Sequence, residues 1–447
     1  MAAGDQVTRS GPGGAGRSGA SGGRFGPFRH RAYLAYWLGV AVSSLGTWLS
    51  AVAGSIYVYQ LTGSTISVGI FNAASFVPIL LFSVWGGQVS DRFDRRRVVL
   101  WTHAVSMLIA AALAAVTIAG AATELTLIVA MFLLNTLWAL GKPSLLALVP
   151  NIVPRDDLQD AVALGSLGFM TGQVVGPLIA AGAMAASGAG LAFAINALTY
   201  GAPVVAMVVL GRMGMTGREV PSRSAVKVVA RSGATFLRTN LWAAGLLIGV
   251  IVTSTAMEIQ RTVAPALAAE TIGVAESNAA LLLFAQSVGS AISFLLFIPI
   301  RRGGWSRPAA LIGIGLQAVG VIVVAIASVM VIAAAGFFLI GLGFAMCFPV
   351  LTAALQEATP DDLRGRMMSY HQLALLGHRP VTALAIGALA ATFGLIVGTL
   401  AWLAFVPIGL IAIRAAWRRL PEGPVTTRDL AAVEAVAEVP PETAIGR

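Results

Sequence analysis

Long apolar runs recur along nearly the whole chain, and most reach about 18 residues or more, enough to cross a bilayer core of ~30 Å as a helix. Reading these runs between charged, glycine or proline breaks predicts about twelve membrane-spanning helices. Only 11% of the 447 residues are charged, against about a quarter in soluble domains. We therefore predict an all-α, multi-span membrane protein with helices near 33–61, 66–89, 98–120, 124–149, 158–186, 189–210, 241–268, 276–299, 308–329, 331–357, 364–393 and 395–418.

The longest hydrophilic segment inside the chain, residues 211–240, divides the predicted spans into two sets of six. This division predicts a first bundle over 33–210 and a second bundle over 241–418, joined by a linker loop. The segments 1–32 and 419–447 are expected to be tails. The start of the first tail is rich in glycine and serine, buries too little apolar surface to fold and is expected to be disordered. It has no hydrophobic region and therefore does not resemble a secretory signal.

The basic residues orient the predicted bundle in the membrane. The turns near 62–65, 121–123, 187–188, 269–276, 330 and 394 contain no lysine or arginine. By the positive-inside rule the basic side faces the cytoplasm, so we expect both termini and the linker to be cytoplasmic. The basic side carries the six basic residues of 211–240 together with Arg29, Arg31, Arg92, Arg95, Arg96, Arg97, Arg155, Arg301, Arg302, Arg307, Arg364, Arg366, Arg414, Arg418 and Arg419.

Several classes of protein are excluded by what the sequence contains. The net charge of +10 lies in short turns and not on one amphipathic face, so we expect no nucleic-acid partner. The single cysteine, Cys347, allows no disulfide framework. No cysteine–histidine cluster has metal-binding spacing, and no Gly-Lys-Ser/Thr phosphate loop is present. We expect no metal, no cofactor and no enzymatic activity. The abundance of arginine, alanine and glycine fits a GC-rich bacterial genome and hence a bacterial cell membrane.

The two halves resemble each other weakly. The stretch "PRDDLQDAVALGSLGFMTGQVVGP" (154–177) begins the predicted fifth span, and "PDDLRGRMMSYHQLALLGHRP" (360–380) begins the eleventh. Each opens with a proline, two acidic residues and a leucine, and each reaches a second proline about 20 residues later. A six-helix unit used twice in parallel is a known transporter architecture, with its binding site between the halves.

The turn between the second and third predicted spans, "GGQVSDRFDRRRVVL" (86–100), concentrates charge, since six of the seven residues 91–97 are ionised. Its glycine, aspartate and arginine spacing resembles the signature of the major facilitator superfamily. The resemblance implies a gating role, in which the aspartate meets an arginine and a helix N-terminus of the other half. The corresponding turn of the second half has Arg302 in the place of the aspartate. The matching residues are Gly87, Asp91, Arg92, Arg95 and Arg96.

A second motif, "GQVVGPLIAAG" (172–182), lies in the fifth predicted span. Gly172, Gly176 and Pro177 resemble the glycine-proline motif of exporters in the superfamily. The alternative is ordinary close packing of helices through small residues. Wider segments resemble the branch that includes the enterobactin exporter and macrolide efflux proteins, which implies proton-coupled antiport. Thr47 and Gln173 depart from that pattern, because relatives often carry an acid and an arginine there.

Few ionisable residues fall at membrane depth, where a charge must face a cavity or a partner. Glu258 and Arg261 lie three residues apart on the predicted seventh helix, and His371, His378 and Arg379 lie on the eleventh. The two histidines, seven residues apart, are expected to share a face. The resemblance implies that both helices line a central cavity, so these five residues are the candidate substrate and proton site. Glu258 alternatively neutralises an arginine as a structural pair, and the histidines are alternative proton carriers.

Other candidates for the cavity wall are uncharged or lie near a helix end. Lys142 is close to the cytoplasmic end of the fourth span and either snorkels to the interface or contacts the cavity. Asn135, Trp138 and Gln286 are candidate polar or aromatic walls.

Together these features predict a secondary active transporter that exports a small molecule, such as a drug, siderophore or secondary metabolite, by alternating access. We expect protons as the coupling ion in antiport, the lipid bilayer as environment, and a monomer. An importer of the same fold is the alternative. A non-transporting sensor or scaffold would need a sizeable soluble domain, and the hydrophilic segments are too short for one.

Overall fold

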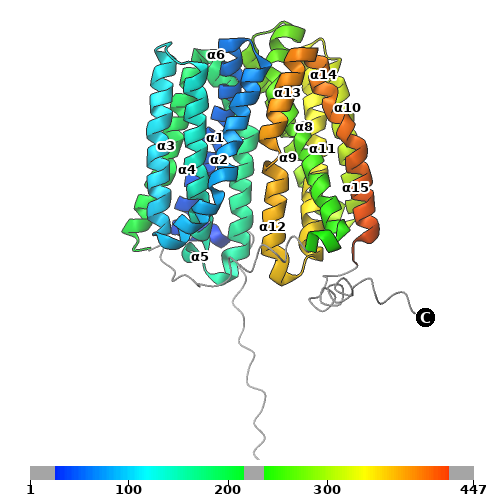
Figure 1. Cartoon of the computed structure of the whole chain (residues 1–447). Coiled ribbons are helices and arrows are strands. Elements are labelled where there is room, and N and C mark those ends of the chain that lie inside the picture. Colours follow the sequence, from blue (N-terminus) through cyan, green and yellow to red (C-terminus); the bar gives the residue numbers. More distant parts are fainter. Residues whose placement is uncertain (1–25, 216–235, 422–447) are drawn as a thin grey trace, which may run out of the picture.

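The structure, a computed structural model, describes residues 26–215 and 236–421 (Figure 1). Most of the predicted tails and of the linker over 211–240 lies outside the described residues. The described part consists of helices and their connections and contains no strand. This is expected of a chain in lipid, because a helix satisfies its backbone hydrogen bonds internally.

The first bundle contains four long helices, a much longer helix and three short helical turns. Cap residues set several of its boundaries: Ser64 accepts the Ser67 amide at the start of α2, and Asp94 accepts the Arg97 amide at the start of α3. The elements are η1 (Gly26–Arg29), α1 (Arg31–Thr62), α2 (Thr65–Arg92), α3 (Arg95–Ile118), α4 (Glu124–Ala147), α5 (Val149–Ile152), η2 (Arg155–Asp157) and α6 (Leu158–Arg212).

The second bundle repeats this plan with more interruptions. The eleventh span of the chain is divided into two helices at Gly377 and His378, just before Pro380. Proline has no N–H to donate to the carbonyl four residues earlier, so the helical hydrogen-bond pattern is interrupted there. The elements are α8 (Leu241–Ala266), η3 (Leu267–Ile272), η4 (Glu276–Asn278), α9 (Ala279–Arg302), α10 (Ser306–Ala325), α11 (Met330–Ala358), α12 (Asp361–Leu376), α13 (Arg379–Phe393), α14 (Leu395–Leu400), η5 (Ala401–Phe405) and α15 (Val406–Arg419).

In the described residues, eleven helical segments are long and apolar enough to span a membrane. The longest, which contains α6, has non-helical backbone at Ser187 and Gly188. Gly188 has a φ of 75°, which glycine adopts without steric cost. The chain turns there, so this segment supplies two spans and the total is the predicted twelve. The prediction of an all-α fold with two six-helix halves is confirmed.

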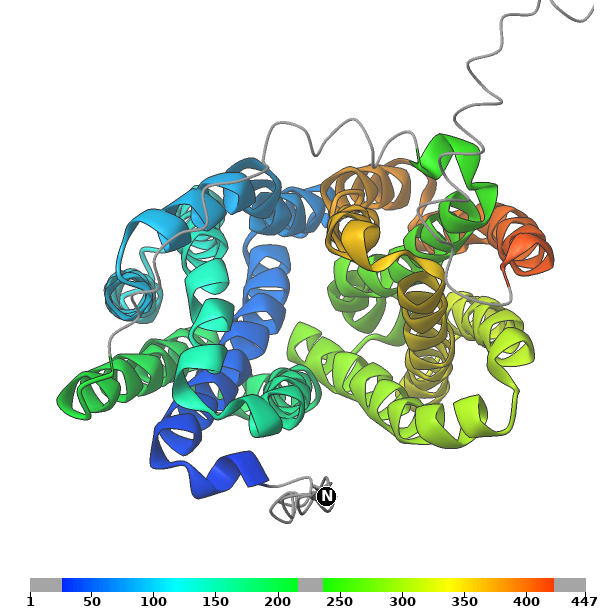
Figure 2. The same cartoon turned by 90° about the horizontal axis from the view of Figure 1, so that it is seen from below.

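The two bundles stand side by side and each wraps around its own interior (Figure 2). One end of the molecule, which we call the basic end, carries the arginines that flank α1, α2, α6 and α15; it is at the bottom of Figure 1. The opposite end, which we call the far end, carries the turns at 62–65, 187–188 and 394.

The bundles meet closely at the far end, where the backbones of α2 and α13 touch. A Cβ atom added to Gly69 would lie 2.6 Å from the carbonyl oxygen of Ala383, and one added to Gly387 would lie 2.6 Å from that of Thr65. The Thr65 hydroxyl also donates a 3.0 Å hydrogen bond to the Gly387 carbonyl oxygen. We call these four residues the far seam. Only small side chains permit this approach.

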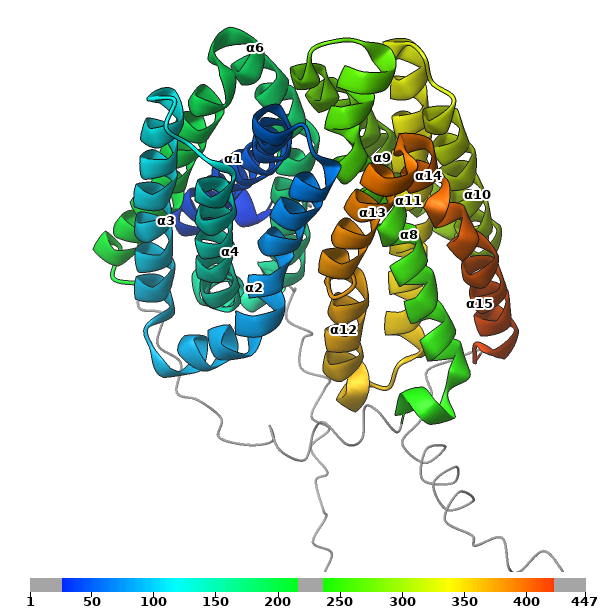
Figure 3. The same cartoon turned by 45° about the horizontal axis from the view of Figure 1, so that its top comes forward.

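Toward the basic end the helices of the two bundles diverge (Figure 3). A Cβ atom added to Gly87 of α2, Gly165 of α6 or Gly365 of α12 would have no other atom within 4 Å. Within the described part of the chain, the halves are therefore closed against each other at the far seam and separated at the basic end.

Candidate functional site

A pocket lies between the two bundles, near the middle of the helices. Its walls come from α1 and α6 of the first bundle and from α8, α9, α11 and α13 of the second. Three of the five predicted site residues, Glu258, Arg261 and Arg379, reach it. The full lining is Trp48, Val52, Gln173, Pro177, Met257, Glu258, Arg261, Leu283, Gln286, Ser287, Phe344 and Arg379.

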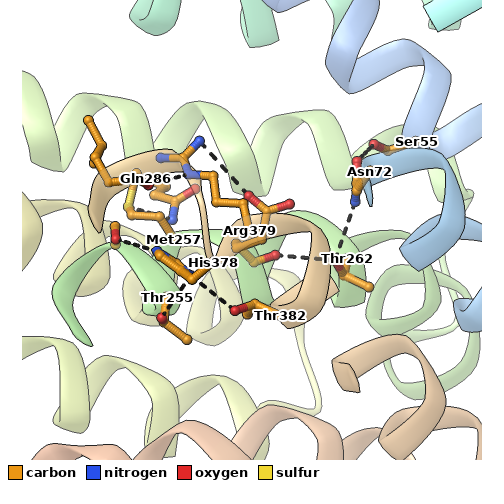
Figure 4. Close-up of polar contacts among 12 residues, drawn as sticks. Ser55, Asn72, Thr255, Met257, Thr262, Gln286, His378, Arg379 and Thr382 are labelled. Carbon is orange, nitrogen blue, oxygen red and sulfur yellow. Dashed lines mark hydrogen bonds and ion pairs between the residues drawn. The ribbon is translucent and has the colours of Figure 1, made fainter. Parts of the chain in front are cut away.

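The acidic group of the pocket is only partly paired. Glu258 Oε2 lies 4.0 Å from Arg379 Nη1, and the two side chains are 2% and 12% exposed. Glu258 Oε1 is buried without a hydrogen-bond partner. The carboxylate is thus held in a low-dielectric site by one long ion pair, and charge of this kind is costly to bury unless it is compensated. Figure 4 shows Arg379, which begins α13, and marks its ion pair with a dashed line.

The arginines of the second bundle stack on aromatic rings of the first. The guanidinium carbon of Arg261 lies 5.1 Å from the ring centroid of Trp48 and 5.9 Å from that of Phe76. The guanidinium carbon of Arg379 lies 5.0 Å from the Phe76 centroid. Cations are attracted to aromatic faces, and a planar guanidinium stacks on them well. These contacts therefore join the two halves at mid-membrane through charge–aromatic pairs.

Polar groups extend this junction toward the far end. The Asn72 amide receives a hydrogen bond from Ser55 at 2.9 Å and donates one of 3.3 Å to Thr262, so α1, α2 and α8 are connected (Figure 4). At the far end, the Tyr59 hydroxyl hydrogen-bonds to Glu270 of η3.

The two predicted histidines lie outside the lining of the pocket. His371 of α12 is 3% exposed, with Nε2 2.9 Å from the Thr352 hydroxyl. His378 lies in the break between α12 and α13, with Nε2 2.7 Å from the Ser254 hydroxyl (Figure 4). The two imidazoles have different neighbours, because His371 contacts α11 whereas His378 contacts α8.

In the charged turn after α2, two arginines hydrogen-bond to the ends of neighbouring helices, whereas two other residues of the motif are exposed. Arg95 donates to the Ala147 carbonyl oxygen at the end of α4 at 3.2 Å, and Arg96 donates to the Met207 carbonyl oxygen near the end of α6 at 3.0 Å. Such contacts stabilise the negative ends of the two helices. Asp91 is exposed and makes no hydrogen bond or ion pair with a described residue. Arg92, also exposed, lies against the ring of Phe93 at 5.9 Å.

The glycine-proline motif of α6 faces α1. A Cβ atom added to Gly172 would lie 2.6 Å from the Ser44 carbonyl carbon, and one added to Gly176 would lie 2.7 Å from Trp48 Cβ. The two glycines therefore allow α1 and α6 to pack closely. Close packing was the alternative to an exporter-type motif in the interpretation of the sequence.

Pro177 adds a contact between the bundles. A proline has no N–H, so the carbonyl four residues earlier loses its helical partner. That carbonyl belongs to Gln173, and the Ser287 hydroxyl of α9 donates to it at 3.0 Å.

Sequence reasoning missed Trp48, Phe76 and Ser287. Uncharged residues give no signal in a search for charges at membrane depth. For Ser287 the one available signal was Pro177, which leaves the Gln173 carbonyl free to accept a hydrogen bond. Of the weaker candidates, Gln286 lines the pocket, whereas the Asn135 amide bonds to the Met131 carbonyl of its own helix. Thr47 bonds to the Ser43 carbonyl and is not part of the lining.

Comparison with known proteins gives one family match over almost the whole chain. The sequence model of the family described as transmembrane secretion effector matches residues 22–440.

Curated relatives are similar over a shorter stretch. The staphyloferrin A transporter of Staphylococcus aureus is 29% identical over 157 residues, 35% of this chain and 40% of that protein. The enterobactin exporter of Shigella boydii is 29% identical over 163 residues, 34% and 36% of the two chains. Macrolide efflux protein A of Streptococcus pyogenes is 26% identical over 152 residues, 33% and 37%. The matched stretch thus spans about two fifths of these relatives.

The fold is also found among solved structures. A bacterial homologue of the human lysosomal transporter Spinster, in an inward-facing and occupied conformation, superposes with a TM-score of 0.70. The superposition covers 90% of this chain and 99% of that one at 13% sequence identity, so it shows a shared fold.

Proposed function

Because the chain belongs to the transmembrane secretion effectors of the major facilitator superfamily, we propose that it exports a small molecule across the cell membrane in exchange for protons. The family and the curated relatives are transporters, so the protein is a multi-pass secondary transporter and not an enzyme. The direction, the coupling ion, a monomeric state and cytoplasmic termini are parts of the proposal.

One observation carries the proton coupling: Glu258 is a buried carboxylate in the pocket between the halves, with one oxygen unpaired. An ionisable group inside a membrane protein that faces a cavity is a functional candidate. The carboxylate can alternate between an ionised form, held by Arg379, and a protonated form. If the pocket opens to one side of the membrane at a time, such a group can take up a proton on one side and release it on the other.

Two further features support export. The relatives with similar sequence include proteins named as an enterobactin exporter and a macrolide efflux protein. The glycine-proline motif at Gly172, Gly176 and Pro177 resembles that of exporters in the superfamily. The concentration of arginine at the basic end supports cytoplasmic termini, and the pocket would then open to the cytoplasm in the conformation described.

The direction can be tested in everted membrane vesicles whose lumen has been acidified by respiration. We expect that adding an exported molecule to the bath will dissipate the acid gradient, because the molecule enters the lumen as protons leave. Staphyloferrin A, enterobactin and a macrolide, named for the relatives, form the first panel. An importer that moves its substrate together with protons would not dissipate the gradient, and would instead accumulate substrate in right-side-out vesicles with an acidic exterior.

The charged turn gives a second prediction. Asp91→Asn is expected to lower turnover by roughly two- to fivefold, corresponding to ~0.3–1 kcal/mol for a charge at a helix end, without changing the amount of protein in the membrane. The reason is that exposed Asp91 can contribute only in a conformation in which the basic end closes. The measurement is the initial rate of cargo–proton exchange in vesicles, divided by the amount of transporter.

A matched control lies three residues away. Asp94→Asn removes the same charge from the same turn, but asparagine caps helices as well as aspartate does, so the Asp94 cap of α3 is kept. We expect this variant to turn over like wild type. Equal losses in the two variants would show that the net charge of the turn matters and that Asp91 has no specific gating role.

A further inference from the structure

Lys142 is an isolated cation in the first bundle. Its Nζ atom lies 4.0 Å from the ring centroid of Trp138, one turn earlier on α4, and 5.3 Å from that of Phe169 on α6. Its side chain is partly buried and makes no ion pair or hydrogen bond with any residue in the described ranges. The aromatic faces attract the ammonium group, but they accept none of its three N–H donors in ordinary hydrogen bonds.

Ring contacts connect this lysine to the central pocket. The Phe169 ring packs edge to face on Trp48, with centroids 6.1 Å apart, and Trp48 lines the pocket and stacks on Arg261. The rings of Phe169 and Trp48 therefore lie between the cationic groups of Lys142 and Arg261. Lys142 lies near the end of α4 at Ala147, so it is closer to the basic end than the pocket is.

Positive charges outnumber negative charges among these groups and the pocket lining. Lys142, Arg261 and Arg379 provide three cations, whereas Glu258 is the one acidic residue among these groups and the pocket lining. Glu258 lies beside Arg379 and leaves Lys142 uncompensated. A ligand with an acidic group would supply the missing charge and accept the free N–H donors, and an aromatic part would pack on the same rings. Charge-assisted hydrogen bonds of this kind are among the strongest in proteins.

We propose that Lys142, Trp138 and Phe169 form a subsite for the acidic group of an aromatic, anionic cargo, which the cargo occupies on its way to the central pocket. This assignment rests on the proposed transport function and names the class of molecule carried. It differs from a snorkelling lysine, whose charge would only reach toward the interface and would not select a ligand.

The test is equilibrium dialysis of the full-length protein in lipid nanodiscs with two probes that share a ring system, 2-naphthoate and 2-naphthylmethylammonium. We expect wild type to bind the anion at least tenfold more tightly than the cation. Lys142→Met should weaken naphthoate binding by about tenfold or more, as expected for the loss of a charged hydrogen-bond donor, and should not weaken binding of the cation. Lys142→Arg should retain most of the affinity for naphthoate.

Arg414→Met is the matched control, because Arg414 is exposed on α15 and its loss also removes one positive charge. This variant should bind naphthoate like wild type. If Lys142→Met proves poorly folded by size-exclusion chromatography, Lys142→Gln keeps a polar side chain and serves instead. The subsite is disproved if wild type does not bind naphthoate or prefers the cation, or if the neutral variants bind naphthoate as well as wild type does.

The vesicle experiment separates this proposal from the proposed function. Cargo–proton exchange with naphthoate binding that does not depend on Lys142 would leave the transport proposal standing and remove the subsite. Lys142-dependent naphthoate binding in a protein that exchanges no cargo for protons would support the subsite and contradict the transport proposal.

Discussion

Glu258→Gln is expected to abolish proton-driven export while the protein still reaches the membrane. Glutamine keeps the size of the side chain but cannot ionise, so it can neither take up nor release a proton in the pocket. The substitution also leaves Arg379 without the carboxylate that lies 4.0 Å from it. Removing one partner of a buried pair can itself destabilise a protein by ~3–5 kcal/mol, so activity alone does not identify the cause.

Two measurements separate proton transfer from a structural pair. Counterflow, in which labelled cargo exchanges for unlabelled cargo without net proton movement, should persist in Glu258→Gln, whereas exchange of cargo for protons should be lost. The double variant Glu258→Gln/Arg379→Gln removes both charges. If the pair is only structural, the double variant should recover transport that the single variant lacks; if Glu258 carries the proton, it should remain uncoupled. Undiminished, pH-insensitive export by Glu258→Gln would remove Glu258 from the mechanism.

The fold could be predicted from the sequence because the membrane imposes a simple rule on it. Lipid excludes charge and unpaired backbone groups, so apolar length marks the spans and arginine marks their ends. Even the turn inside α6 had a signal, since Ser187 and Gly188 separate two apolar runs without any charge. The helix boundaries follow caps such as Ser64 and Asp94, which are readable as local motifs.

The site could be predicted only in part. Glu258, Arg261 and Arg379 stood out because charge is rare at membrane depth, and the structure brings them to one pocket. Their partners Trp48 and Phe76 come from the other bundle and are uncharged, so nothing in the sequence pairs them with the arginines. Helical periodicity also does not reveal that His371 hydrogen-bonds to α11 and His378 to α8, because those partners belong to other helices.

Gly387→Leu is expected to prevent closure of the far seam and to trap the transporter with its pocket open at the far end. A Cβ atom at this position would lie 2.6 Å from the Thr65 carbonyl oxygen, and that oxygen belongs to backbone that cannot rotate away. Overpacking typically costs ~1–3 kcal/mol. Because the clash exists only when the seam is closed, the same energy shifts the balance between the two conformations by roughly 5- to 150-fold. Transport should fall by a comparable factor, since the cycle requires both conformations.

The shift can be measured by chemical accessibility. The only native cysteine, Cys347, is buried, so a Cys347→Ala background with a Ser287→Cys reporter gives one reactive thiol in the pocket. A membrane-impermeant maleimide added to intact cells should label the reporter faster in Gly387→Leu than in the parent. Gly315→Leu on α10 is the control, because a Cβ atom added to Gly315 meets no atom within 4 Å. Slower labelling in Gly387→Leu would place the far end on the cytoplasmic side, and equal labelling with normal transport would show that the seam does not control access.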